Sequence, residues 1–399
     1  MRTRHRGILA AGLTIALVAG SSLASTAQDR GALSFAELDE VRALTQLADD
    51  VADGELPGGD AWLKLNHHLL RGGNGRVYVP FTVTIDEAPG RFGSVSLYIR
   101  AANQGEDSSA GKERAERQRL VGFELGQLPV FVPERATAAT ADGATFLAGE
   151  ASTALRLAGD TAVDEARYPF EDVHFIDFSE AADDDGGREP YRVRRALAVA
   201  PGTYDIYVAV REYSLSGNHP DDRGSAVIKR TLSIPPISPV DLALSSIILA
   251  DELRLLDRPL PAEKQPTRPY VFGGTEIVPA PDPLLSRAET LAVAFFIYNL
   301  HSDADGKPNA TVRYRLHQQA PAGEEFIGET APTEFTPETL PQGFDYEAAG
   351  RQLFASQMLP LGNFSEGGYR LEVIVSDNLA EHSTARSLQF IIQPGAPDL

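Results

Sequence analysis

A turn followed by an alternating strand occurs twice in this chain, and it constrains the fold more than any other feature. The first copy covers residues 201–212 and the second covers residues 367–377. In each copy a tyrosine and three aliphatic residues occupy every second position, namely Tyr204, Ile206, Val208 and Val210, then Tyr369, Leu371, Val373 and Val375. Successive side chains of a strand point to opposite faces, so each copy predicts a half-buried strand. Another alternating run follows each copy, at 231–234 and 387–392, and we therefore predict the same closing β-hairpin twice.

The length of 399 residues suits two or three domains, and the two closing hairpins favour two. We expect one β-sandwich over 59–235 and a second over 241–393, with a short tail at 394–399. The proline-rich segment 236–240 is the expected linker, because prolines cannot continue a central strand and favour extended backbone.

The first 27 residues have the parts of a secretory signal: a basic start, an apolar run over 8–19, and small residues before the expected cleavage after Ala27. We therefore expect an exported protein, periplasmic or extracellular. The sequence has no cysteine, which excludes disulfides and cysteine chemistry. The formal net charge of −20 disfavours nucleic acid and anionic membranes as partners. No later segment approaches the roughly 20 apolar residues of a spanning helix, so we expect no membrane insertion after cleavage.

One amphipathic helix is predicted within the segment 28–58. Residues 34–37 match a capping box, and apolar residues then recur at helical spacing until Gly54. The apolar face could dock on the first sandwich or on a partner, and packing within the same domain is the commoner use of such a face.

The first predicted sandwich opens with a hairpin and contains a long interruption. Alternating runs at 62–70 and 77–85 flank the turn residues 72–75. Pro80 has no amide hydrogen, which predicts a strand edge or a bulge at that position. Between 104 and 166 the strand pattern lapses for far longer than the usual connection of about 4 to 6 residues, so we interpret this segment as an insertion.

The repeated motif resembles the last two strands of immunoglobulin-like and fibronectin type III-like extracellular sandwiches. This resemblance implies a mainly β fold, with two tandem antiparallel Greek-key sandwiches after a short N-terminal helix. In such folds a tyrosine at the start of the penultimate strand hydrogen-bonds to backbone across a corner, and Tyr204 and Tyr369 would hold that place. The motif is degenerate and supports a fold class without an activity.

The chain more loosely resembles exported bacterial proteins of the kind associated with GWxTD-motif or von Willebrand factor A-related domains. The phrases that carry this resemblance lie at 78–81, 168–177 and 270–279. The chain departs from both, because its only tryptophan is Trp62 in Ala-Trp-Leu and it has no Asp-x-Ser-x-Ser motif. The resemblance therefore transfers no site residue.

An acidic turn is the main candidate metal site. Asp303, Asp305 and Asn309 partly match calcium loops, which collect about six to eight oxygens. The third acidic position and the distal glutamate of an EF-hand are missing, and a hairpin turn explains the same residues equally well. The loop 183–187 has three aspartates and the same ambiguity.

The histidines do not form a convincing catalytic or metal-binding group. His67 and His68 are adjacent, so on a strand they would point to opposite faces. His174 has Asp172 and other acids nearby and could be a hydrogen-bonded structural histidine or a general base, but no nucleophile motif accompanies it. We predict no catalytic residue and no cofactor.

These features favour an exported, non-enzymatic structural or interaction module that binds a protein or glycan partner in the cell envelope or extracellular space. The alternative is a carbohydrate-binding module or a β-sandwich glycan-active enzyme, in which exposed aromatic side chains stack on sugars. Tyr207, Phe296 and Tyr298 are the aromatic residues that this alternative would use, and core or cross-strand packing is the favoured role for them. A third hypothesis is a calcium-stiffened tandem adhesin.

Overall fold

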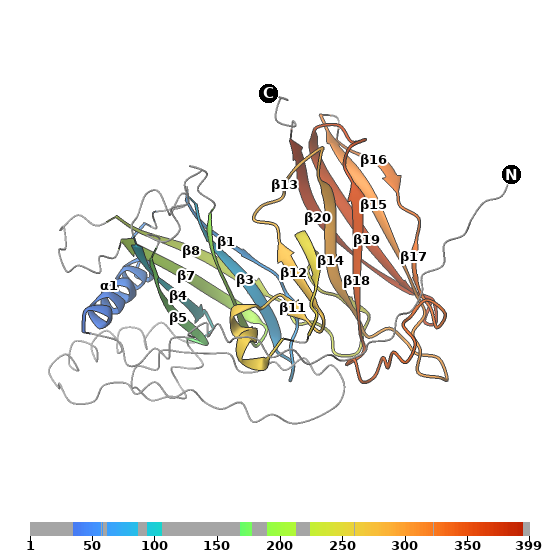
Figure 1. The fold of residues 1–399 in the computed structure, drawn as a ribbon, viewed down its shortest axis with the longest axis horizontal. Coiled ribbons are helices and arrows are strands. Elements are labelled where there is room, and N and C mark those ends of the chain that lie inside the picture. The colour runs from blue at the N-terminus through green and yellow to red at the C-terminus, as the bar shows by residue number, and fades with distance from the viewer. Residues whose placement is uncertain are drawn as a thin grey trace, which may run out of the picture.

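A computed structural model of the chain describes residues 35–56, 58, 62–86, 94–105, 168–177, 190–212, 224–258, 260–321 and 323–393. The expected signal, nearly all of the expected insertion, the acidic loop 183–187 and the expected tail lie outside the described residues. The described part is mainly β with one α-helix, which confirms the fold class (Figure 1).

The first sandwich consists of two antiparallel sheets. The β3 sheet contains β1 (Leu63–His67), β2 (Leu70–Arg71), β3 (Val77–Ile85) and β6 (Tyr191–Val199). The β7 sheet has the order β5 (Phe170–Asp177), β4 (Ser94–Asn103), β7 (Gly202–Glu212) and β8 (Ser225–Ile234). Inward-facing aliphatic residues of both sheets form one core, including Val79, Val83, Ile99 and Val208.

The helix α1 (Phe35–Ala52) covers the outer face of the β7 sheet. Leu44, Ala48 and Val51 pack there on aromatic and aliphatic residues of β4, β7 and β8. The guanidinium of Arg100, buried beneath the helix, donates to Asp49 at 2.6 Å. The apolar stripe of the helix is therefore used for packing within the first sandwich, as the sequence favoured.

The second sandwich is built from two six-stranded sheets. The β14 sheet contains β9 (Ala243–Leu244), β10 (Ile248–Leu255), β11 (Val271–Phe272), β12 (Thr275–Pro279), β14 (Thr290–Tyr298) and β18 (Gln352–Pro360). The β19 sheet contains β13 (Leu284–Ser286), β15 (Ala310–Ala320), β16 (Gly323–Glu329), β17 (Thr333–Phe335), β19 (Gly367–Asp377) and β20 (His382–Gln393). A short 3-10 helix, η1 (Ala262–Thr267), lies between β10 and β11.

One strand pair corrects the expectation of purely antiparallel sheets. β13 pairs with β20 in parallel, whereas the other described pairs are antiparallel. The reason is that the chain changes sheet between β12 and β13, and it reaches the free edge of β20 running in the same direction.

The two motif tyrosines occupy equivalent corners. The hydroxyl of Tyr204 donates to the carbonyl of Ala200 at 2.9 Å, and that of Tyr369 donates to the carbonyl of Ser365 at 2.7 Å. Both rings are buried in the core of their sandwich. Each hydroxyl thus ties the loop before the penultimate strand to the strand itself.

The two sandwiches pack directly on each other through the outer faces of the β3 and β14 sheets (Figure 1). Leu70 and Tyr78 of the first sandwich join an apolar cluster with Tyr270, Phe296 and Tyr298 of the second. We call this contact region, together with the hydrogen bonds around it, the junction.

Pro80 explains where the first sandwich reaches toward the second. His68 donates its backbone N–H to the carbonyl of Pro80 at 3.0 Å, but the proline has no N–H to return the bond. Strand pairing is interrupted there, and the backbone N–H of Leu69 instead donates to Ser246 Oγ at 2.8 Å. The register is the same on both sides, His67 opposite Phe81 and Leu70 opposite Tyr78, so the expected edge or bulge at Pro80 is wrong. The position is a break in a central strand pair.

We expect the substitutions Tyr204→Phe and Tyr369→Phe each to lower the free energy of unfolding by about 1 kcal/mol, because each removes a hydrogen bond to backbone. Chemical denaturation checks this. Tyr314→Phe is the matched control, since Tyr314 is buried but its hydroxyl has no hydrogen-bond partner. Removal of the Tyr314 hydroxyl should leave the free energy of unfolding unchanged or raise it. Equal effects of all three substitutions would contradict the role assigned to the corners.

His68 should make the protein sensitive to mild acid. Burial, and then the neighbouring His67, lower the pKa of His68 from 6.5 to about 3. Below pH 6.5 the His68 side chain is protonated in the unfolded chain but stays neutral in the folded chain. The free energy of unfolding therefore falls as pH drops, by about 1.4 kcal/mol per pH unit. His68→Gln should flatten this loss between about pH 6.5 and pH 4, measured by denaturant titration. His382→Gln is the control, because His382 is exposed. If the free energy of unfolding has the same pH dependence in the unmodified protein and in both variants, His68 is not the source of the acid sensitivity.

Candidate functional site

The acidic turn is held together by its own backbone. Asp303 Oδ1 accepts the N–H groups of Asp305 at 2.9 Å and Lys307 at 2.8 Å. Asn309 Oδ1 accepts the side-chain amide of Asn378 at 2.8 Å. Within the described ranges no group of three or more His, Cys, Asp or Glu side chains could hold a metal ion. Asp303 Oδ1 and Asn309 Oδ1, two of the oxygens that the sequence nominated for calcium, are engaged in turn and strand contacts.

His174 lies in a charge network at the edge of the first sandwich. Its Nε2 is 2.7 Å from Asp172 Oδ2, and Arg195 Nε donates to the same oxygen at 2.7 Å. Burial alone would raise the pKa of Asp172, but the hydrogen bonds and charges of His174 and Arg195 hold it below its usual value. His174 and Arg195 thus both stabilise the mostly buried carboxylate of Asp172, and the described residues of this network include no nucleophile that a general base would serve.

The aromatic residues proposed for sugar stacking are not exposed. Tyr207 is buried beneath α1, and Phe296 and Tyr298 are buried in the junction. The exposed aromatic side chains of the described residues, Phe35, Tyr191 and Phe326, come from three separate elements. They do not form a row on one strand face. Tyr207, Phe296 and Tyr298 are packing residues, which is the role that the sequence analysis favoured for them, and they are not available for stacking on sugars.

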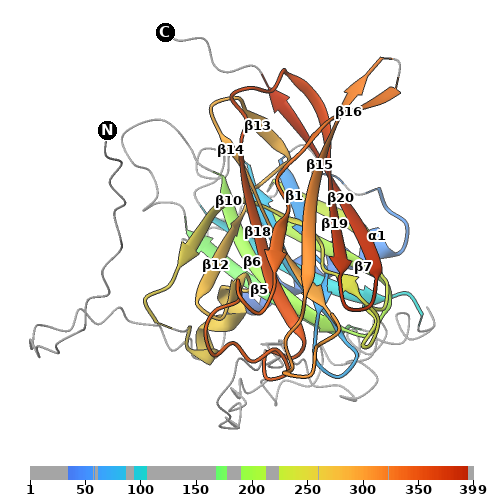
Figure 2. The same ribbon diagram turned by 90° about the vertical axis from the view of Figure 1, so that its right-hand side faces the viewer.

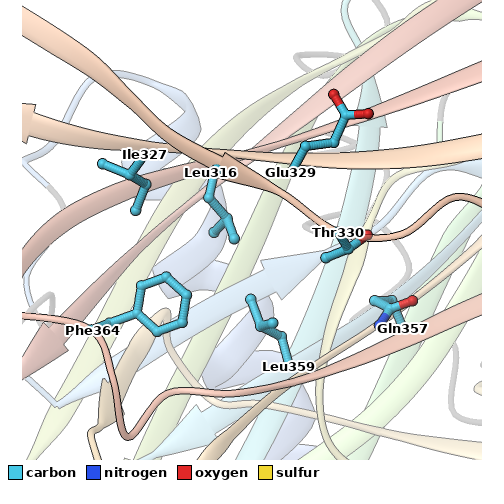
Figure 3. Close-up of a pocket in the computed structure, with 8 residues that line it drawn as sticks. Leu316, Ile327, Glu329, Thr330, Gln357, Leu359 and Phe364 are labelled. Atoms are coloured by element: carbon cyan, nitrogen blue, oxygen red, sulfur yellow. The ribbon is translucent and has the colours of Figure 1, made fainter.

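The second sandwich is open along one side, and this side is the candidate functional site. β18 ends its sheet and pairs with β14, while β16 ends the opposite sheet and pairs with β15 (Figure 2). Between these two edges lies a cleft of about 410 Å³. Its lining is mostly apolar and consists of Leu316, Ile327, Gly328, Glu329, Thr330, Gln357, Leu359 and Phe364 (Figure 3).

A β-bulge turns one side of the cleft apolar. Leu316 pairs with Gly328 and His317 with Phe326, so Ile327 is the extra residue of β16. A bulge bends its strand and re-aims a side chain. Ile327, 40 % exposed, lines the cleft beside Leu316, while the ring of Phe326 packs edge-on against His317.

The β18 side of the cleft extends the apolar core of the sandwich to the surface. Leu353 and Ala355 of β18 are buried in the core, and Gln357 and Leu359 follow on the same face at the cleft. Phe364 packs edge-on against the corner residue Tyr369, with ring centroids 5.9 Å apart. Leu359 and Phe364 face Leu316 and Ile327 across the cleft in Figure 3.

The cleft has almost no charge of its own. Its one titratable lining residue, Glu329, forms an ion pair with Arg315 at 2.7 Å, and the carboxylate points away from the apolar side chains (Figure 3). Such a site can bind apolar groups, but it does not bring an acid and a base together for catalysis.

Sequence reasoning missed every residue of this cleft. The available signal was Phe326-Ile327 within the otherwise acidic and glycine-containing stretch 323–329. Two adjacent large apolar residues on a short, exposed strand are unusual unless another surface covers them.

No known protein family matches the chain, and no curated protein sequence matches it. The resemblance to GWxTD-motif and von Willebrand factor A-related proteins therefore has no support beyond the phrases that suggested it.

Solved structures of bacterial alpha-2-macroglobulins do show a weak likeness to the chain. Salmonella alpha-2-macroglobulin reacted with methylamine has 12 % identity and a TM-score of 0.18, over 85 % of this chain and 17 % of that protein. The native conformation of the Escherichia coli protein has 12 % identity and a TM-score of 0.18, over 86 % and 17 %. The trypsin-activated Escherichia coli form has 11 % identity and a TM-score of 0.20, over 83 % and 18 %. The chain thus spans under a fifth of their length, and a likeness this weak carries no argument about activity.

Proposed function

We propose that this protein is an exported, non-enzymatic interaction module of the cell envelope or extracellular space, whose second sandwich binds an extended segment of a partner polypeptide. The observation that carries the proposal is the apolar cleft beside the open edge of β18. Export rests on the N-terminal pattern of the sequence. α1, the single α-helix of the described residues, is not long and apolar enough to cross a membrane.

Geometry favours an extended occupant over a helix or a small molecule. An edge strand presents backbone N–H and C=O groups on its free side, and a chain that pairs with β18 would point every second side chain toward the cleft. The cleft volume of about 410 Å³ leaves room for several such side chains.

Charge adds a preference to this mode of binding. The chain has a formal net charge of −20, and the cleft itself is nearly neutral. We therefore expect the partner segment to carry Lys or Arg at the positions between its apolar residues, where those side chains face the acidic surface.

The first test uses nine-residue peptides, which match the nine residues of β18. One peptide alternates Val or Leu with Thr or Lys, a second has the same composition in scrambled order, and a third has a central proline. The full chain without its first 27 residues should bind the first peptide and not the other two in fluorescence anisotropy, because proline removes the pairing N–H. Mass spectrometry should recover the peptide intact, as a non-enzymatic module requires.

Variants of the chain locate the binding. Ile327→Asp should lower the affinity for the first peptide by about tenfold or more, because it places a carboxylate in the apolar cleft. Leu379→Asp is the matched control, because Leu379 is 42 % exposed and does not line the cleft. Equal binding of the proline peptide, or equal losses in the two variants, would reject strand addition at β18.

A further inference from the structure

A second cavity lies in the first sandwich where β6 approaches η1 of the second. Its volume is about 160 Å³, and its lining consists of His174, Tyr191, Arg192, Val193, Arg194, Arg195 and Thr267. Three arginines therefore meet at one small cavity in a protein whose formal net charge is −20. This concentration of positive charge runs against the rest of the molecule.

The three arginines are not equivalent. Arg195 forms an ion pair with Asp172 at 2.7 Å, which neutralises it. Arg192 and Arg194 lie on the opposite face of β6, and each is half-buried. Their Nε atoms are buried without a hydrogen-bond partner, and no ion pair joins either guanidinium to a carboxylate of the described residues. Two positive charges thus remain unneutralised side by side.

The acids across the junction do not neutralise this pair. Glu276 is already held by Arg268 through two hydrogen bonds, at 2.7 and 3.1 Å. Asp251 interacts with Arg192 and Arg194 beyond ion-pair distance, and burial raises the pKa of its carboxyl group although both arginines act in the opposite direction. Burial, and then the charge of Arg192, lower the pKa of Arg194, and the opposing charge of Glu276 does not reverse this shift.

Half-buried guanidinium groups with unused donors are costly, and an anion that bonds to both relieves the cost. Guanidinium groups match the oxygens of phosphate and sulfate in geometry, and two unneutralised charges match a dianion better than a carboxylate. The small volume of the cavity suits a single oxyanion group.

We propose that this cavity binds a doubly charged tetrahedral oxyanion, a phosphate or sulfate group, between the guanidinium groups of Arg192 and Arg194. The group is either a free inorganic ion or the end of a larger molecule such as a lipid headgroup or a glycan. Because η1 forms one wall, the bound anion also links the two sandwiches across the junction. This site is separate from the cleft at β18.

The test measures thermal unfolding of the full chain without its first 27 residues, in a buffer free of phosphate and sulfate. Sodium phosphate and sodium sulfate should raise the melting temperature to a plateau, whereas sodium chloride and sodium acetate at the same ionic strength should not. Phosphorus NMR line broadening gives an independent measure of phosphate binding. No shift beyond that of chloride would overturn the proposal.

Variants separate the cavity from general charge. Arg192→Gln and Arg194→Gln should each lower the affinity for phosphate by about tenfold or more. Arg313→Gln, which removes an exposed charge on β15, should leave that affinity unchanged. Without added anion the two cavity variants should be at least as stable as the unmodified protein, because the repulsion is gone. Equal weakening in all three variants would overturn the site.

Two further arms identify the occupant. Binding of glycerol 3-phosphate as well as inorganic phosphate would support a larger carrier of the phosphate group, and binding of inorganic phosphate alone would support a free ion. Residues 183–185, three aspartates that lie outside the described residues, provide the last arm. If their triple substitution by Asn creates phosphate binding that the unmodified protein lacks, an internal carboxylate is the occupant and the proposal fails.

Discussion

The hydrogen bond from the Tyr270 hydroxyl to the carbonyl of Pro80, 3.1 Å long, marks the contact on which the arrangement of this protein depends. Pro80 cannot donate to the neighbouring strand, so the pairing of β1 and β2 with β3 breaks beside it, and the freed backbone turns to the second sandwich. Arg71 makes two further contacts with the second sandwich. Its guanidinium carbon lies 4.5 Å from the centre of the Tyr298 ring, and its Nη1 donates to Asn299 Oδ1 at 2.7 Å. The β14 sheet is consequently covered on both faces, by its own core and by the junction. Its central strand is buried along nearly its whole length for this reason.

The cleft of the second sandwich lies away from this face, where the edge strands β16 and β18 of its two sheets meet. The cleft is connected to the repeated motif of the sequence, because the corner residue Tyr369 supports Phe364 at its wall. The first sandwich has the same corner, but α1 covers the outer face of its β7 sheet and the junction covers the outer face of its β3 sheet. The two halves therefore share a folding device and differ in what their surfaces leave available.

The two proposed sites use different chemistry. The cleft offers apolar side chains and a strand edge, and its single carboxylate is paired. The cavity beside η1 offers two unpaired guanidinium groups in a protein that is acidic as a whole. A polypeptide bound at the first and an oxyanion bound at the second would act independently in binding, because no lining residue is common to both.

Local patterns in the sequence predict the helix, many of the strands and the two tyrosine corners. Period-two patterns in 204–210 and 369–375 identified strands with one buried face, and the helical stripe of 35–51 identified α1, because both signals depend on near neighbours in the chain. The burial of whole surfaces and the meeting of distant side chains depend on how the sheets pack. The sequence favours a packing role for Phe296 and Tyr298, but only the fold shows that residues of the first sandwich help to bury them. The cleft combines β15, β16 and β18, and the oxyanion cavity combines β5, β6 and η1. Contacts between segments so distant in sequence follow from sheet order and domain packing, which a single sequence does not encode in any local pattern.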